Sequence, residues 1–154
     1  MIIRYIHFFQ LFILFIGFLG TQVGVAGESS TKNVDVQVSV ALADSTISIG
    51  KTGMVLVTFT PADDFHVNAV PPVEFSLRSA RAFRLSGKPT QIADKESGYL
   101  LTRSPVAQPF RLSKAVPPGV YRMAGTVVYF YCSDSEGWCR KHVEPVECFV
   151  KVVP

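Results

Sequence analysis

The sequence predicts an antiparallel all-β domain, a sandwich or a barrel, behind an N-terminal targeting segment. Apolar and polar residues alternate with a period of two in several segments, and turn residues recur at intervals of roughly ten residues. No segment carries an apolar stripe of helical period over ten residues. The 154 residues suffice for one domain, and the formal net charge of +3 is spread without a basic run. We therefore expect no nucleic-acid partner.

Residues 1–26 have the pattern of a secretory signal peptide. Arg4 supplies the positive charge, residues 8–20 form the apolar stretch, and residues 24–26 offer small side chains for cleavage after Ala26. A retained membrane anchor is the alternative, because residues 5–25 approach the length of a bilayer span. Polar residues dilute that span, so we expect cleavage and no membrane segment in the mature form. Either way the folded part is expected to be periplasmic or secreted, where disulfides persist.

Residues 27–33 form a polar linker, and the folded domain is expected over residues 34–154. Strands are predicted where apolar residues alternate with polar ones or where β-prone residues cluster. The irregular part is residues 79–108, where only short strands are expected. The predicted strand segments, in order, are 34–40, parts of 41–51, 54–60 up to Pro61, 73–77, 83–85, 99–101 and one beginning near Phe110.

The C-terminal part predicts a long hairpin. A Pro-Pro-Gly turn at residues 117–119 precedes residues 121–131, the longest uninterrupted strand candidate. A six-residue polar loop, residues 133–138, separates Cys132 from Cys139, and the return strand is expected over residues 143–153.

Three cysteines are too few for a disulfide scaffold, and one is left over. Cys132 and Cys139 flank a loop that favours tight turning, so hairpin geometry makes them the favoured pair. A Cys139–Cys148 pair is the alternative, and it would demand a second tight loop. Cys148 shares a face with Val146 and Val150, which is typical of a small buried hydrophobe.

Metal and hydrolase chemistry have little support in the sequence. Two cysteines with His142 give three ligands at a spacing unlike that of zinc sites, so no metal and no cofactor are expected. No serine lies in a nucleophile-elbow pattern. His66, close in sequence to Asp63 and Asp64, is the remaining candidate reactive group. A histidine in such a turn is more often a surface or capping feature.

A disulfide between Cys132 and Cys139 can be structural, a staple of the hairpin, or it can be redox-active, a reagent in thiol–disulfide exchange. As a staple, closing a loop of about eight residues would contribute about 2.5 kcal/mol. As a reagent, it would benefit from exposure and from the basic residues at 140–142, which lower a thiol pKa and favour Cys139 as the leaving thiolate. Asp134 and Glu136 act the other way. Trp138 would cover the disulfide, contact a partner or fold back on its own sheet.

The hairpin sequence resembles a known family. A Pro-Gly-x-Tyr turn, a long strand that ends in an aromatic residue and Cys132, an acidic Gly-aromatic loop and Cys139 are similar to the N-terminal periplasmic domain of the thiol:disulfide interchange protein DsbD. Residues 65–68, followed by Pro71 and Pro72, are similar to a second segment of that family. Together these segments cover about 50 residues of the mature chain.

The resemblance implies an immunoglobulin-like β-sandwich whose Cys132–Cys139 disulfide exchanges with thioredoxin-like redox proteins or a membrane electron donor. It makes both cysteines catalytic, and a monomer is expected. The binding residues expected around them are Tyr131, Asp134, Glu136 and Trp138. The sequence departs from the family in three ways: the loop between the cysteines is one residue longer, Cys148 is extra, and residues 79–108 show no counterpart of the family's cap over the disulfide. A non-catalytic adaptor module with a structural disulfide is the alternative function.

Overall fold

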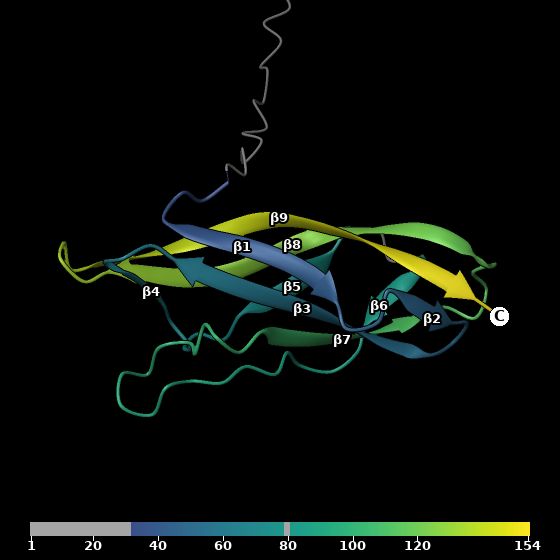
Figure 1. Cartoon of the computed structure of the whole chain (residues 1–154), viewed down its shortest axis with the longest axis horizontal. Helices are drawn as coiled ribbons and strands as arrows, with labels where there is room; N and C mark the ends of the chain where they lie inside the picture. The colour runs from purple at the N-terminus through teal and green to yellow at the C-terminus, as the bar shows by residue number, and fades with distance from the viewer. Residues whose placement is uncertain (1–31, 79–80) are drawn as a thin grey trace, which may run out of the picture.

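The computed structural model describes residues 32–78 and 81–154, which form two packed β-sheets (Figure 1). The predicted signal peptide, residues 1–26, lies outside the described residues. No helix in the described parts is long and apolar enough to cross a membrane. The described strands are β1 (Val36–Leu42), β2 (Thr46–Ser48), β3 (Thr52–Pro61), β4 (Phe65–Val67), β5 (Glu74–Leu77), β6 (Phe83–Leu85), β7 (Val106–Leu112), β8 (Gly119–Ser133) and β9 (Trp138–Val153).

The strand order identifies the fold. One sheet has the order β1-β3-β7-β6, and the other has the order β2-β9-β8-β4 with β5 also paired to β8. The paired strands are antiparallel apart from β2, which runs parallel to β9. A four-strand sheet facing a sheet built on the last two long strands is the arrangement of an immunoglobulin-like sandwich. The predicted all-β, immunoglobulin-like fold is confirmed.

The core lies between the two sheets. Alternate residues of β3 and β7, among them Val57 and Phe110, are fully buried and face Val127 and Tyr129 of β8. Phe59 bridges the sheets, because its ring meets the Tyr129 ring edge-on at 4.9 Å between centroids. This packing places the inner face of β8 against the first sheet.

The hairpin differs from the prediction in its extent. The return strand begins at Trp138 rather than at residue 143, and pairing runs without interruption from Gly119–Val152 to Ser133–Trp138. The turn is therefore residues 134–137, closed by Gly137 at φ 68°. Residues 139–141 are all exposed, because this tip carries polar side chains on both faces. A period-two pattern needs one buried face, so the sequence carries no strand signal there.

Cys148 faces the core beside Val146, as the sequence predicts, but it is only partly buried. It is the free cysteine of the described residues. Burial raises the pKa of its thiol.

Candidate functional site

The site is built on the tip of the β8–β9 hairpin. Cys132 and Cys139 stand directly opposite each other in the ladder and form a disulfide with an S–S distance of 2.01 Å, so the favoured pairing is confirmed. Their neighbours Tyr131 and Ser133 belong to the buried face, so both sulfurs lie on the outer face of the sheet. Cys132 is only 5% exposed, whereas Cys139 is exposed.

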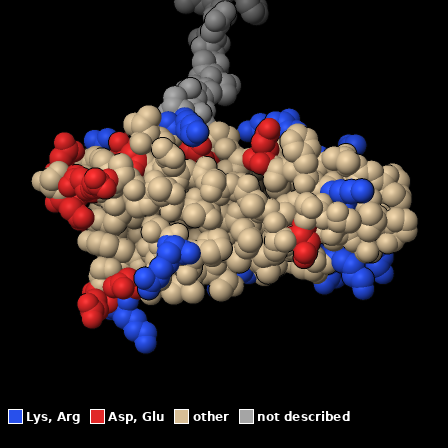
Figure 2. Space-filling view, viewed as in Figure 1, with Lys and Arg blue, Asp and Glu red and all other residues tan. Residues whose placement is uncertain are grey.

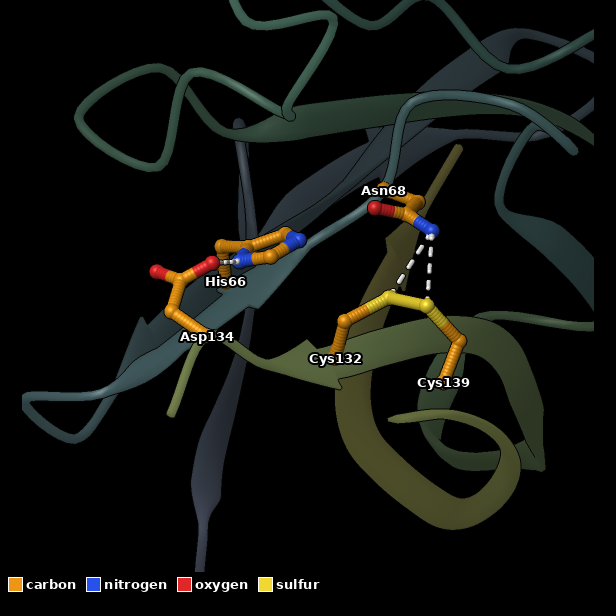
Figure 3. Close-up of a disulfide and its surroundings, with 5 residues drawn as sticks. All are labelled: His66, Asn68, Cys132, Asp134 and Cys139. Atoms are coloured by element: carbon orange, nitrogen blue, oxygen red, sulfur yellow. Dashed lines mark hydrogen bonds and ion pairs between the residues drawn. A yellow bond between two sulfur atoms is a disulfide. The ribbon is translucent and has the colours of Figure 1, made fainter. Parts of the chain in front are cut away.

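The cover over Cys132 comes from β4 and the residue that follows it. His66 is paired with Cys132 across the β4–β8 ladder, and the Asn68 backbone N–H donates to the Phe130 carbonyl at 2.9 Å. The Asn68 side-chain amide points at the disulfide, with Nδ2 3.2 Å from Cys132 Sγ and 4.0 Å from Cys139 Sγ (Figure 3). A sulfur in a disulfide is a weak acceptor, but a thiolate is a strong one.

His66 has one neighbour at the edge of its ring and one on its face. Its side chain is 14% exposed, and Nδ1 lies 3.0 Å from Asp134 Oδ1 (Figure 3). That contact is within ion-pair distance but does not have hydrogen-bond geometry. The Tyr99 ring stacks on the imidazole with centroids 3.5 Å apart. His66 is thus a strand residue packed beside the disulfide rather than a feature of the turn that contains Asp63 and Asp64.

Tyr99 belongs to a segment that lies along β4. The Leu100 N–H donates to the Val67 carbonyl at 2.7 Å, and Asn68 and Tyr99 form an isolated β-bridge. Asp94 shapes the turn before Tyr99, because its Oδ1 accepts from the backbone N–H groups of Glu96 and Ser97 at 3.0 and 2.9 Å. The stretch in which the sequence shows no cap therefore supplies Tyr99, which packs on His66 and pairs with Asn68.

Asp64 fastens the hairpin turn to the end of β3. It adopts φ 76°, and its carboxylate accepts from Ser133 Oγ at 2.6 Å, from Ser135 Oγ at 2.7 Å and from Ser135 N at 2.9 Å. The bond from Ser133, then that from Ser135, lowers the pKa of Asp64. A lowered pKa stabilises the folded form at neutral pH, and this contribution is lost as the pH falls through the folded-state pKa.

Trp138 lies on the face opposite the disulfide. Its ring packs against Tyr131 at 5.5 Å and Phe65 at 5.9 Å, and the Arg140 guanidinium stands 3.9 Å from its centroid. Its indole N–H donates to Glu136. Of the three roles open to Trp138, the structure shows the indole folded back on its own sheet.

The other predicted binding residues are divided between the two faces. Tyr131 is 6% exposed on the core side, where burial raises the pKa of its phenol. Glu136 and Asp134 are exposed on the turn. Asp134 contacts His66, which lies on the same face of the sheet as the disulfide. The predicted binding residues all lie on the hairpin, whereas Asn68 and Tyr99, which the structure places on the disulfide side, are not among them. The spacing of His66 and Asn68 is a usable signal, since residues two apart on a strand share a face.

A zinc site of Cys132, Cys139 and His142 is not formed. His142 is paired with Tyr129 on the face opposite the sulfurs, and its Nε2 lies 3.0 Å from Glu144 Oε2. Across residues 32–78 and 81–154, no group of three or more His, Cys, Asp or Glu is placed to hold a metal.

Removing the disulfide tests its structural contribution. We expect the Cys132→Ala, Cys139→Ala double variant to have a free energy of unfolding about 2.5 kcal/mol lower, because the unfolded chain regains the conformational entropy that the closed loop removes. Urea titration followed by tryptophan fluorescence measures the difference, with Cys148→Ala as the matched control for loss of a thiol. A loss above about 5 kcal/mol would mean that the hairpin does not form without the bond.

Comparisons with known proteins leave the family open. No protein-family model matches the sequence, and no curated protein matches it. A similar solved structure is the crystal structure of the GAE domain of yeast GGA1, at 10% sequence identity and a TM-score of 0.39, covering 75% of this chain and 95% of that one. A similarity of this size says nothing about activity or partners, and the fold assignment rests on the strand order described above.

Proposed function

We propose that this domain exchanges its Cys132–Cys139 disulfide with the thiols of thioredoxin-like partners outside the cytoplasm. The observation that carries the proposal is the unequal presentation of the two sulfurs: Cys139 is exposed, and Cys132 is buried beneath an amide donor 3.2 Å from its sulfur. The resemblance of the hairpin to the periplasmic DsbD domain supports the same chemistry and a periplasmic or secreted location.

The unequal presentation favours an order of steps. A partner thiolate attacks Cys139 Sγ, the intramolecular S–S bond breaks, and Cys132 leaves as a thiolate that accepts the Asn68 N–H. The partner's second thiolate then attacks its own sulfur in the mixed disulfide and releases Cys139 as a thiolate. The domain gains two electrons and then two protons from solvent, and the partner dithiol becomes a disulfide. Electron flow to the next partner is the reverse sequence.

This order differs from the one that the basic residues at 140–142 favour. Arg140 lies over the Trp138 ring on the opposite face, so its charge is directed away from the sulfurs. Lys141 shares the face of Cys139, but we give more weight to the burial of Cys132 and to the Asn68 donor, and Cys139 becomes the attacked sulfur in our proposal.

The reduction potential of the purified mature domain tests the proposal. Equilibration with defined thiol buffers, read by mass spectrometry, should give a value above about −250 mV, typical of exchangeable couples. A value below about −300 mV would make the bond a staple and overturn the proposal.

Trapping tests the order of attack. Cys132→Ser should accumulate mixed disulfides through Cys139 in extracts of the exported fraction, because the domain then lacks the second thiol of the pair that would resolve them. Cys139→Ser should trap far less, since Cys132 is 5% exposed. Trapping through Cys132 alone would reverse the order, and no trapped species in either variant would argue against exchange.

Asn68→Ala tests the donor. Losing one hydrogen bond to a charged sulfur is worth about 1.5 kcal/mol, so the reduced form is destabilised and the potential should fall by about 30 mV. Thr126→Ala removes another side-chain hydrogen bond of β8, to Ser76 Oγ, and should leave the potential unchanged. An unchanged potential in Asn68→Ala would remove Asn68 from the mechanism.

A binding module with a structural disulfide is the second candidate. The observation in its favour is the set of contacts that hold the hairpin tip, in which Asp64 accepts hydrogen bonds from the turn and the Trp138 ring packs against Phe65 and Tyr131. It predicts a potential below about −300 mV together with partner binding that survives loss of both cysteines in the folded fraction.

A further inference from the structure

A basic pocket lies on the first sheet, away from the disulfide. Arg84 of β6 and Arg111 of β7 line it together with Arg81 and Lys114, around a volume of about 260 Å³. Leu112 and Ser113 complete its wall, and no acidic residue lines it. The four cations come from two short segments that the sheet brings side by side.

The two arginines on β6 and β7 repel each other, and a bound anion would offset that repulsion. Arg84 and Arg111 stand directly opposite each other in the β6–β7 ladder, and like charges in that position repel. Within residues 32–78 and 81–154, none of the four cations forms an ion pair with a carboxylate. A bound anion would relieve this repulsion.

The neighbouring groups are placed to complete an anion site. The Ser113 backbone N–H donates to the Ala82 carbonyl at 2.9 Å, which ties the start of β6 to the end of β7. Ser113 Oγ accepts the Ala115 N–H at 3.3 Å, which leaves its own proton to donate. Gly50 lies against the aliphatic part of Lys114, because a side chain there would come within 3.1 Å of Lys114 Cγ.

Acidic residues are absent from the described residues that line the pocket. In Figure 2, Asp and Glu gather at the end that carries the β8–β9 turn, whereas Lys and Arg are spread over the face shown, with one group near the opposite end. Because this described lining has four cations and no carboxylate, the local field in the pocket favours an anion.

We propose that this pocket binds a phosphate group, carried by a phospholipid headgroup or as free phosphate. Two arginines can each engage phosphate oxygens in a bidentate manner, and Lys114 and the Ser113 hydroxyl supply further donors. The site is independent of disulfide exchange, so its occupation and the reduction potential are separate measurements.

Two binding assays on the mature, oxidised domain distinguish the sources of phosphate. Calorimetric titration with inorganic phosphate at constant ionic strength measures the free ion, and flotation with phosphatidylglycerol vesicles, against phosphatidylcholine vesicles, measures the headgroup. The pocket variant is Arg84→Gln, Arg111→Gln. The matched control is Lys95→Gln, Arg103→Gln, which removes the same charge from exposed residues outside the pocket.

We expect the pocket variant to weaken phosphate binding, vesicle binding or both by at least tenfold, and the control to change either less than twofold. Loss of phosphate binding assigns the free ion, and loss of vesicle binding alone assigns the headgroup. No binding in either assay, or equal weakening in both variants, would overturn the proposal. The pocket variant should remain folded by circular dichroism, because it removes the repulsion between two exposed side chains.

Discussion

Tyr129→Ala is expected to lower the free energy of unfolding by about 3–5 kcal/mol. The Tyr129 side chain is fully buried between the sheets, and its ring meets Phe59 edge-on. Truncation removes a large apolar surface and leaves a cavity that rigid β3 and β8 cannot close. Urea titration of the oxidised domain, followed by fluorescence and circular dichroism, measures the loss.

Tyr129→Phe separates the ring from the hydroxyl. The Asn33 side-chain amide donates to the Tyr129 hydroxyl oxygen at 3.1 Å, and burial raises the pKa of that phenol. Removing the hydroxyl alone should cost about 1 kcal/mol, since one neutral hydrogen bond is lost. If the phenylalanine variant were as unstable as the alanine variant, the hydrogen bond rather than the packed ring would be the source of stability.

Gly125→Ala is expected to destabilise the domain by about 3 kcal/mol or more, at the upper end for overpacking. A Cβ at this position would stand 2.0 Å from the Ser76 carbonyl oxygen, because β5 pairs with β8 here and Gly125 stands opposite Leu77. The obstacle is backbone, so relief requires β5 to move away from β8. Amide hydrogen exchange should therefore show loss of protection in β5 beyond the global change.

Gly53→Ala is the matched comparison. Its Cβ would also clash, at 2.4 Å from Ile47 Cδ1 and 2.5 Å from Phe110 Cζ, but both are ends of side chains. Side-chain ends can rotate away, so this variant should lose less than Gly125→Ala does. A larger loss at Gly53 would show that the core around Phe110 is less adaptable than the β5–β8 contact.

The sequence predicts the strands where one face is buried. Residues 73–77 alternate and residues 54–60 are β-prone, and these segments coincide with β5 and β3 to within a few residues. The start of β9 escapes prediction, because residues 139–141 are exposed on both faces and carry no periodic signal. The cysteine pair is predictable, since hairpin pairing is local in sequence.

The rest of the site depends on contacts that no local pattern encodes. Asn68 reaches Cys132 because β4 pairs with β8, across a sequence separation of 64 residues. Tyr99 reaches His66 through an irregular segment with no strand of its own. The basic pocket is hidden in the same way, because Arg84 and Arg111 become neighbours only through the β6–β7 ladder.

The uninterrupted β8–β9 ladder limits how far the backbone can change when the disulfide is reduced. Every residue of β8 is paired with β9, and the sulfur bridge spans the last pair but one at the tip. Opening that bridge leaves the remaining rungs intact, so the ribbon can fray only from its outer end. The hydrogen bonds from Ser133 and Ser135 to Asp64 and the packing of Trp138 against Tyr131 limit even that fraying. We therefore expect the oxidised and reduced molecules to share one backbone, with the change confined to a few atoms at the tip.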